Sequence, residues 1–232
     1  MNKIISMSVW GNNPRYILGA KRQIDLAKKY YPDWKIRIYT DNPLNFLGEE
    51  IETVKISDGS YGMFWRFLAL FDSEENIVMV RDSDSRTTIR EQRCIQEWLS
   101  SDKTFHTFKD HEAHYEFPII GCSFALKGKL DDTTRQIMLS YMNREKYYCS
   151  DQNFLRDYVW GQVQQNAMVH SMQHPGWFSE SRKKLKNPFS FCGNGYDERD
   201  MPLYPNSLDN MANWNPQLCP IEFKFDEGVM YE

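Results

Sequence analysis

A strand-like apolar segment, "NIVMV" at residues 76–80, runs directly into "RDSDSR", where two carboxylates stand between two arginines. The apolar run has the length of a buried strand in an α/β sheet. In an extended chain, residues i and i+2 point to the same side, so Asp82 and Asp84 are expected to present both carboxylates in one direction. Ligand sites in open α/β sheets lie at the carboxyl ends of strands. We therefore expect a binding edge at this turn.

Segments of strand and helix character alternate along the rest of the chain. Ile4–Val9 has strand character, and a helix is expected from about Pro14, with Asn13 as its N-cap. Thr88 and Glu91 have the spacing of a capping box, which predicts the start of another helix. Further strands are expected within 34–42, 104–108 and 109–126, and further helices within 63–71, 131–142 and 150–160.

This alternation predicts an α/β fold with a mostly parallel central sheet flanked by helices. Residues 1–172 are expected to form the core of a single domain. The region 173–232 holds six of the ten prolines and has little periodicity. We expect it to be an irregular C-terminal extension that packs on the same domain.

Composition narrows the class of protein. The net charge of −4 lacks the basic excess of a general nucleic-acid binder, so no nucleic-acid partner is expected. The five cysteines are widely spaced and include no C-x-x-C pair, which favours reduced thiols and a cytoplasmic location. No apolar run approaches the roughly 20 residues that span a bilayer, so no transmembrane segment is expected.

The paired carboxylates of Asp82 and Asp84 favour a metal site, because two like charges held together need a cation. Hard carboxylate oxygens suit Mg²⁺ or Mn²⁺, and such ions share their coordination with substrate phosphates. The alternative is a solvated acidic turn flanked by salt-bridging arginines. An EF-hand loop is disfavoured because Thr87 and Arg93 stand where glycine and glutamate are required.

Eight motifs occur in one order: "SVWG", "YTD", "GMFWRF", "RDSDSR", "EWLSS", "FHTFKDHEAH", "PIIGCSFAL" and "DQNFL". Together they resemble small GT-A-fold, D-x-D-containing glycosyltransferases of bacteria and large DNA viruses, over about Lys3 to His170. The resemblance implies a GT-A fold and a nucleotide-sugar donor, with uridine expected as the base. It also implies Mn²⁺ or Mg²⁺ on the donor diphosphate, and transfer of the sugar to a glycan or another hydroxyl acceptor.

Carried over by position, the resemblance implies roles for particular residues. Asp82 and Asp84 match the metal-binding pair, and His170 is expected as a third ligand, with His174 as its competitor. Asp151 and Gln152 match the catalytic pair near the sugar, which favours retention at the anomeric carbon. The residues expected to bind the nucleotide sugar are Val9, Trp10, Gly11, Thr40, Asp41, Arg66, Arg81, Ser83, Asp110, His111 and Gly121.

The chain departs from the family pattern at two places. Residues 121–125 read "GCSFA" where the family often has "GGMWG", and Lys109 replaces the arginine of "RDHPxH". Four alternatives stay open. Asp151 can be a helix cap, and Arg66 can pair with an internal acid. The whole chain can be a non-catalytic nucleotide-sugar binding module, or a metal-dependent phosphatase or nucleotidyl hydrolase.

Overall fold

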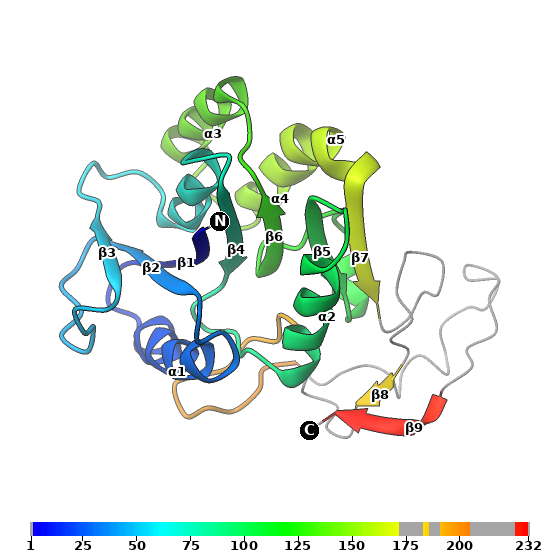
Figure 1. Cartoon of the computed structure of the whole chain (residues 1–232). Coiled ribbons are helices and arrows are strands. Elements are labelled where there is room, and N and C mark those ends of the chain that lie inside the picture. Colours follow the sequence, from blue (N-terminus) through cyan, green and yellow to red (C-terminus); the bar gives the residue numbers. More distant parts are fainter. Residues whose placement is uncertain (1, 172–182, 186–190, 205–225, 232) are drawn as a thin grey trace.

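A computed structural model describes residues 2–171, 183–185, 191–204 and 226–231 (Figure 1). Its main sheet contains β1 (Asn2–Val9), β2 (Lys35–Thr40), β3 (Glu52–Lys55), β4 (Asn76–Arg81), β5 (Phe105–Lys109), β6 (Ser123–Lys127) and β7 (Ala167–Ser171). The helices are α1 (Pro14–Tyr30), α2 (Ile89–Leu99), α3 (Asp132–Arg144), α4 (Ser150–Phe154) and α5 (Trp160–Val163), with 3₁₀ helices η1 (Gly62–Phe71) and η2 (Glu112–Tyr115). A π-helical turn, Leu155–Val159, joins α4 to α5, and a 3₁₀ turn, Gln164–Asn166, leads to β7. Strands β8 (Lys183–Leu185) and β9 (Asp226–Tyr231) pair separately.

The seven strands lie in the order β3-β2-β1-β4-β6-β5-β7. Only β6 runs antiparallel to its neighbours, and the other pairs in this sheet are parallel. The chain moves outward from β1 to β3 and then returns to place β4 on the other side of β1. This reversal leaves a crevice at the carboxyl ends of β1 and β4, where open α/β sheets bind ligands. The predicted α/β fold with a mostly parallel sheet is confirmed.

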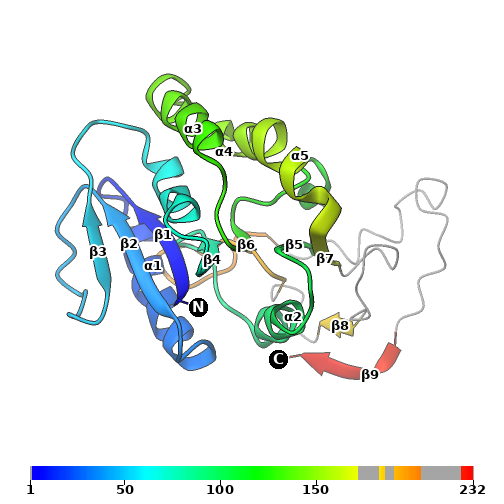
Figure 2. The same cartoon turned by 45° about the horizontal axis from the view of Figure 1, so that its top comes forward.

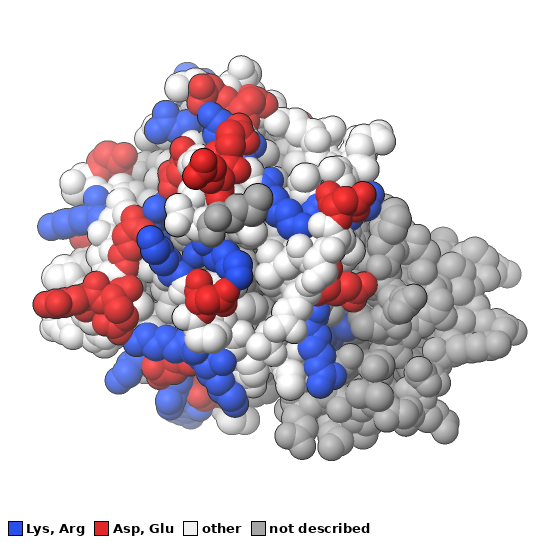
Figure 3. Space-filling view, in the orientation of Figure 1, with Lys and Arg blue, Asp and Glu red and all other residues white. Residues whose placement is uncertain are grey.

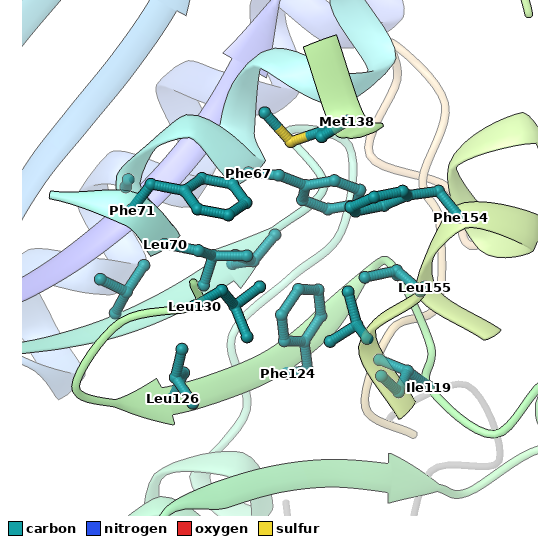
Figure 4. Close-up of a cluster of buried hydrophobic side chains, with 14 of the residues drawn as sticks. Phe67, Leu70, Phe71, Ile119, Phe124, Leu126, Leu130, Met138, Phe154 and Leu155 are labelled. Atoms are coloured by element: carbon teal, nitrogen blue, oxygen red, sulfur yellow. The ribbon is translucent and has the colours of Figure 1, made fainter. Parts of the chain in front are cut away.

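Helices cover both faces of the sheet (Figure 2). On one face, α1 and α2 pack on β1, β2 and β4 through a buried cluster that includes Ile24, Ile77 and Met79. On the other face, η1, α3 and α4 pack on β4 and β6 through a second cluster, which Figure 4 shows around Phe67, Phe124 and Phe154. Successive residues of β4 thus alternate between the two cores, as a central strand requires.

The two predicted helix caps are confirmed. The Asn13 side chain accepts a hydrogen bond from Arg15 N at 3.0 Å, and the Thr88 side chain accepts one from Glu91 N at 3.1 Å. The Glu91 carboxylate does not complete the capping box, because it pairs with Arg81 in the interior. No described helix is long and apolar enough to cross a bilayer.

The segment 191–204, orange in Figure 1, lies against the aspartate turn that follows β4. Tyr196 N donates to Asp84 O at 2.9 Å, and Gly195 forms an antiparallel bridge with Ser85. Arg86 donates to Asp200 Oδ1 at 2.7 Å. This part of the C-terminal region therefore closes over the turn that holds the two carboxylates.

Candidate active site

A pocket opens at the crevice between β1 and β4. Its walls come from the ends of these strands, the first turn of α1, η1, the loop before β6 and the start of α4. The lining residues are Ser8, Trp10, Arg15, Tyr16, Met63, Arg66, Asp82, Ser83, Asp84, Gly121, Cys122, Tyr148, Cys149, Asp151 and Gln152.

Strand β1 fixes the backbone of Arg66. Ser6 Oγ donates to Arg66 O at 2.6 Å, and Arg66 N donates to Ser8 Oγ at 2.7 Å. Side chains alternate along β1. Ile5, Met7 and Val9 pack into the core on the α1 side, so Ser6 and Ser8 face η1 on the other side of the sheet. The sheet thereby aims one arginine of an otherwise apolar helix at the pocket.

The Arg66 guanidinium joins two carboxylates that are far apart in sequence. Its Nη2 lies 2.7 Å from Asp151 Oδ2 and 3.1 Å from Asp82 Oδ1. The Arg66 and Asp151 side chains are each 6% exposed, whereas Asp82 is 35% exposed. Burial acts to lower the pKa of Arg66, but the charges of Asp82 and Asp151 outweigh it, and the pKa is raised. The internal acidic partner named as the alternative for Arg66 is therefore present.

The second carboxylate of the motif has its own arginine. Asp84 Oδ2 accepts a hydrogen bond from Arg15 Nε at 2.7 Å, and the Asp84 side chain is only 8% exposed. Burial and the neighbouring charge of Asp82 nevertheless raise the pKa of Asp84, and burial raises that of Asp151. Three carboxylates facing two guanidinium groups leave the pocket one negative charge in excess when all are ionised. A bound cation would relieve this excess.

Two glycines allow the walls to close around these charges. A Cβ on Gly19 of α1 would stand 2.7 Å from Ser83 O and 2.9 Å from Asp84 Cα, so this helix rests directly on the aspartate turn. A Cβ on Gly121 would stand 3.2 Å from Asp151 Oδ2 and 3.3 Å from Arg66 Nη2. Close approach of the backbone is thus required at Gly19, and the packing at Gly121 is tight.

Asp151 is not the N-cap of its helix. The cap position of α4 is Cys149, in the left-handed region at φ 65°, and it makes no side-chain capping bond. Asp151 Oδ1 accepts a hydrogen bond from Gln152 N at 2.9 Å, and Gln152 Oε1 accepts one from Gly121 N at 3.0 Å. The carboxylate is therefore held by Arg66 and directed into the pocket.

The structure brings eight of the predicted site residues into this pocket. They are Trp10, Arg66, Asp82, Ser83, Asp84, Gly121, Asp151 and Gln152.

Four other predicted residues lie at the ends of β1 and β2 but do not line the pocket. Gly11 N donates to Asp41 Oδ1 at 3.1 Å, which ties the two strand ends together. Val9 is buried in the core beneath them, and Thr40 Oγ1 hydrogen-bonds with the backbone of Asn42.

Three predicted nucleotide-sugar residues lie elsewhere. Arg81 is fully buried and paired with Glu91 of α2. It continues the alternation of Ile77 and Met79 along β4, so its side chain points toward the core under α2. Asp110 is equally buried and receives hydrogen bonds from Arg90 at 2.7 and 2.9 Å. His111 accepts a hydrogen bond from Ala113 N at the start of η2. These side chains serve the structure and do not line the pocket.

His170 is also placed away from the aspartate pair. Its Nδ1 lies 2.7 Å from His106 Nε2, and its Nε2 lies 3.0 Å from Glu97 Oε2. Burial lowers the pKa of both histidines. With both ring nitrogens engaged inside the domain, His170 does not join the aspartates as the expected third metal ligand. His174 lies outside the described residues.

The two aspartates fit a metal ion whose remaining coordination positions are filled by substrate phosphates and water. Among the described residues, no group of three or more His, Cys, Asp or Glu side chains is placed to hold an ion. Asp82 and Asp84 supply hard carboxylate oxygens in a pocket that carries an excess of negative charge. Mg²⁺ is commonly held by one or two carboxylates plus substrate phosphates and water.

Sequence reasoning missed several pocket residues. Arg15 carried a usable signal, because a cation in the first turn of a helix opposes the macrodipole and needs a nearby anion. Ser8 also carried one, since it alternates with the apolar residues of a buried strand. The other missed residues are Tyr16, Met63, Tyr148 and Cys149.

No family model matches the chain, and no curated protein matches it. Among solved structures, a glycosyltransferase involved in the glycosylation of the major capsid of PBCV-1 is 15% identical over 75% of this chain and 84% of its own, with a TM-score of 0.46. The galactosyltransferase LgtC, in complex with donor and acceptor sugar analogs, is 12% identical over 88% and 84%, with a TM-score of 0.45. The 4-diphosphocytidyl-2C-methyl-D-erythritol synthase from Anaerococcus prevotii is 11% identical over 73% and 86%, with a TM-score of 0.47. Likenesses at this level assign no function to the chain.

Proposed function

We propose that the protein is a metal-dependent glycosyltransferase, which moves a sugar from a nucleotide-diphosphate sugar, with uridine as the base, to a hydroxyl of a glycan or another acceptor. The observation that supports this most is the pairing of Arg66 with both Asp82 and Asp151 at the crevice between β1 and β4. This pairing gathers one cation and two carboxylates in one pocket, where we assign Asp82 to the metal and Asp151 to the sugar.

Each of these groups has a part in breaking the glycosyl–phosphate bond. Asp82 and Asp84 would hold Mn²⁺ or Mg²⁺, and such an ion, when bound, neutralises negative charge on the diphosphate. Arg66 and Arg15 face the same pocket and would stabilise the charge that grows on the leaving diphosphate. Asp151 would stabilise positive charge at the sugar carbon or accept the acceptor's proton, and we favour retention at that carbon.

Calorimetric titration of UDP with and without Mn²⁺ tests the metal and donor site. We expect binding that needs the ion and is lost in Asp82→Asn and Asp84→Asn, because the aspartates then no longer hold the cation. Equal affinity in EDTA would contradict the metal role.

Incubation with a panel of nucleotide sugars and Mn²⁺ tests the reaction. Transfer predicts release of the nucleotide with the sugar on an added acceptor. Binding without turnover would identify a binding module, and release of inorganic phosphate would identify a hydrolase. Either result would overturn the proposal.

A further inference from the structure

A second cavity, of about 420 Å³, lies at the carboxyl ends of β5 and β7. It falls within the 300–1,000 Å³ range typical of small-molecule sites. It is lined by Lys109, Tyr115, Glu116, Phe117, Pro118, Trp160, Val169 and Ser171. None of these residues belongs to the pocket at the aspartate turn.

Lys109, the residue that departs from the family pattern, brings a largely buried cation to this cavity. Its Nζ donates to the carbonyl oxygens of His114 and Phe117. Within the part of the chain that the structure describes, Lys109 forms no ion pair with a carboxylate, and Glu116 stays on the exposed rim. Burial lowers the pKa of Lys109 to about 8, so the amine is mostly charged at neutral pH. A charge buried in this way is stabilised by an anion.

The walls suit a ring that carries hydroxyl groups. Tyr115, Phe117 and Trp160 supply aromatic surface. Tyr115 OH and Ser171 Oγ lie 2.8 Å apart, and Lys109 Nζ lies 6.0 Å from the centroid of the Tyr115 ring. Apolar walls with a few convergent polar groups are the usual composition of a ligand site.

The same two segments of chain line both sites. The loop before β6 contributes Pro118 to this cavity and Gly121 to the aspartate pocket. The segment that begins with α4 contributes Asp151 to the pocket and continues to Trp160 in the cavity. Pro118 and Gly121 are three residues apart, so the two sites approach to within about 11 Å along this loop.

We propose that this cavity binds a negatively charged sugar of the acceptor, one whose ring carries a carboxylate or a phosphate. That this ligand is the acceptor rests on the proposed function, but its binding does not. Lys109 pairs with the anion, and the aromatic side chains contact the ring.

Calorimetry without donor or metal, near neutral pH, tests the site. The probes are methyl glucuronide, methyl glucoside 6-phosphate and neutral methyl glucoside. We expect at least one anionic probe to bind about tenfold or more tightly than the neutral one, since a hydrogen bond to a charged group is stronger than one between neutral groups. The two anionic arms distinguish a carboxylate from a phosphate ligand.

Variants locate the binding. Lys109→Met should lose the preference for the anion, Lys109→Arg should keep it, and Trp160→Leu should weaken every probe. Lys127→Met is the matched control, because Lys127 also donates to backbone carbonyls and lies over an aromatic ring, but outside the cavity. If Lys109→Met does not fold, Lys109→Arg and Trp160→Leu still decide the outcome.

Proton uptake gives a second measurement. An anion beside Lys109 raises the pKa of the amine, so binding near pH 8 should take up protons, seen as different heats in buffers of different ionisation enthalpy. The proposal is overturned if no probe binds, if the neutral glycoside binds as well as the anions, or if Lys109→Met keeps the preference. A failed UDP titration would overturn the donor site and leave these results unaffected.

Discussion

Four of the arginines around the aspartate motif fall into two groups. Arg81 with Glu91 and Arg90 with Asp110 form ion pairs buried inside the domain, where each charge is neutralised by its partner and no ligand reaches it. Arg15 and Arg66 pair with carboxylates that line the pocket. An anionic ligand in the pocket can therefore replace these carboxylates as the partner of either arginine. The sequence alone does not show which of these four arginines are sealed in the interior. Only the packing of α1, α2 and η1 on the sheet separates them.

Arg66→Met is expected to destabilise the protein by about 3–5 kcal/mol, because it leaves Asp151 buried without its partner. Urea unfolding measures this loss. Adding Asp151→Asn should recover part of it, since the two side chains interact directly. Arg156→Met, which breaks an exposed ion pair with Asp157, should have little effect. An Arg66 variant as stable as wild type would contradict the ion pair.

Asp151→Asn is expected to lower turnover by about 10²-fold or more while donor affinity changes little, because the carboxylate acts on the transition state. Steady-state rates and UDP-sugar titrations separate these effects. Since the Asp151 side chain does not cap α4, the change should not be traceable to helix stability. Turnover at the wild-type rate would remove Asp151 from the mechanism.

At the scale of elements, the contact between α1 and the aspartate turn sets the geometry of the site. Gly19→Ala is expected to cost about 1–3 kcal/mol, as overpacking does, and to weaken UDP binding by displacing residues 83–84. Gly161→Ala is the matched control: nothing lies within 4 Å of its added Cβ, so helix propensity should stabilise the protein by up to about 1 kcal/mol. Thermal unfolding and calorimetry measure both. Normal UDP affinity in Gly19→Ala would show that the turn tolerates a shift.

The elements also show what sequence reasoning can reach. The caps of α1 and α2 and the strand before the aspartates were predictable, because each depends on neighbouring residues. Strand β3 was missed because it is a short, mostly exposed edge strand without apolar alternation. Strand β7 was missed because it follows a helical turn with no glycine or proline between them. The anchoring of Arg66 by β1 joins residues about 60 positions apart, which no local pattern encodes.

At the scale of the whole molecule, buried histidines predict sensitivity to acid. Burial lowers the pKa of His106 and His170, and that of His114 to about 3, so all three are neutral in the folded state at neutral pH. The unfolded chain binds protons on them near pH 6.5, so stability falls as pH drops below that value. His114, with its pKa lowered to about 3, should by itself cost up to about 1.4 kcal/mol per pH unit below pH 6.5, and His106 and His170 add to this in the same direction.

Urea unfolding at pH 7, 6 and 5 measures this slope, and His114→Asn should reduce it by about the share of one histidine. Asparagine can still accept the hydrogen bond that Asp110 N donates to His114 Nδ1 at 3.2 Å. Asp84 and Asp151, with raised pKa values, act in the opposite direction closer to pH 4. Equal stability at pH 7 and pH 5 would refute the prediction.

The contact of segment 191–204 with the aspartate turn imposes an order on biosynthesis. Arg86 and Asp200, which join the two, are 114 residues apart. At about 5–20 residues per second, the ribosome makes the second roughly 6–23 seconds after the first. Throughout that interval the nascent chain carries its aspartates on a turn that nothing yet holds from that side. A chain released before residue 191 should therefore leave this turn more open to protease than a chain released after residue 204.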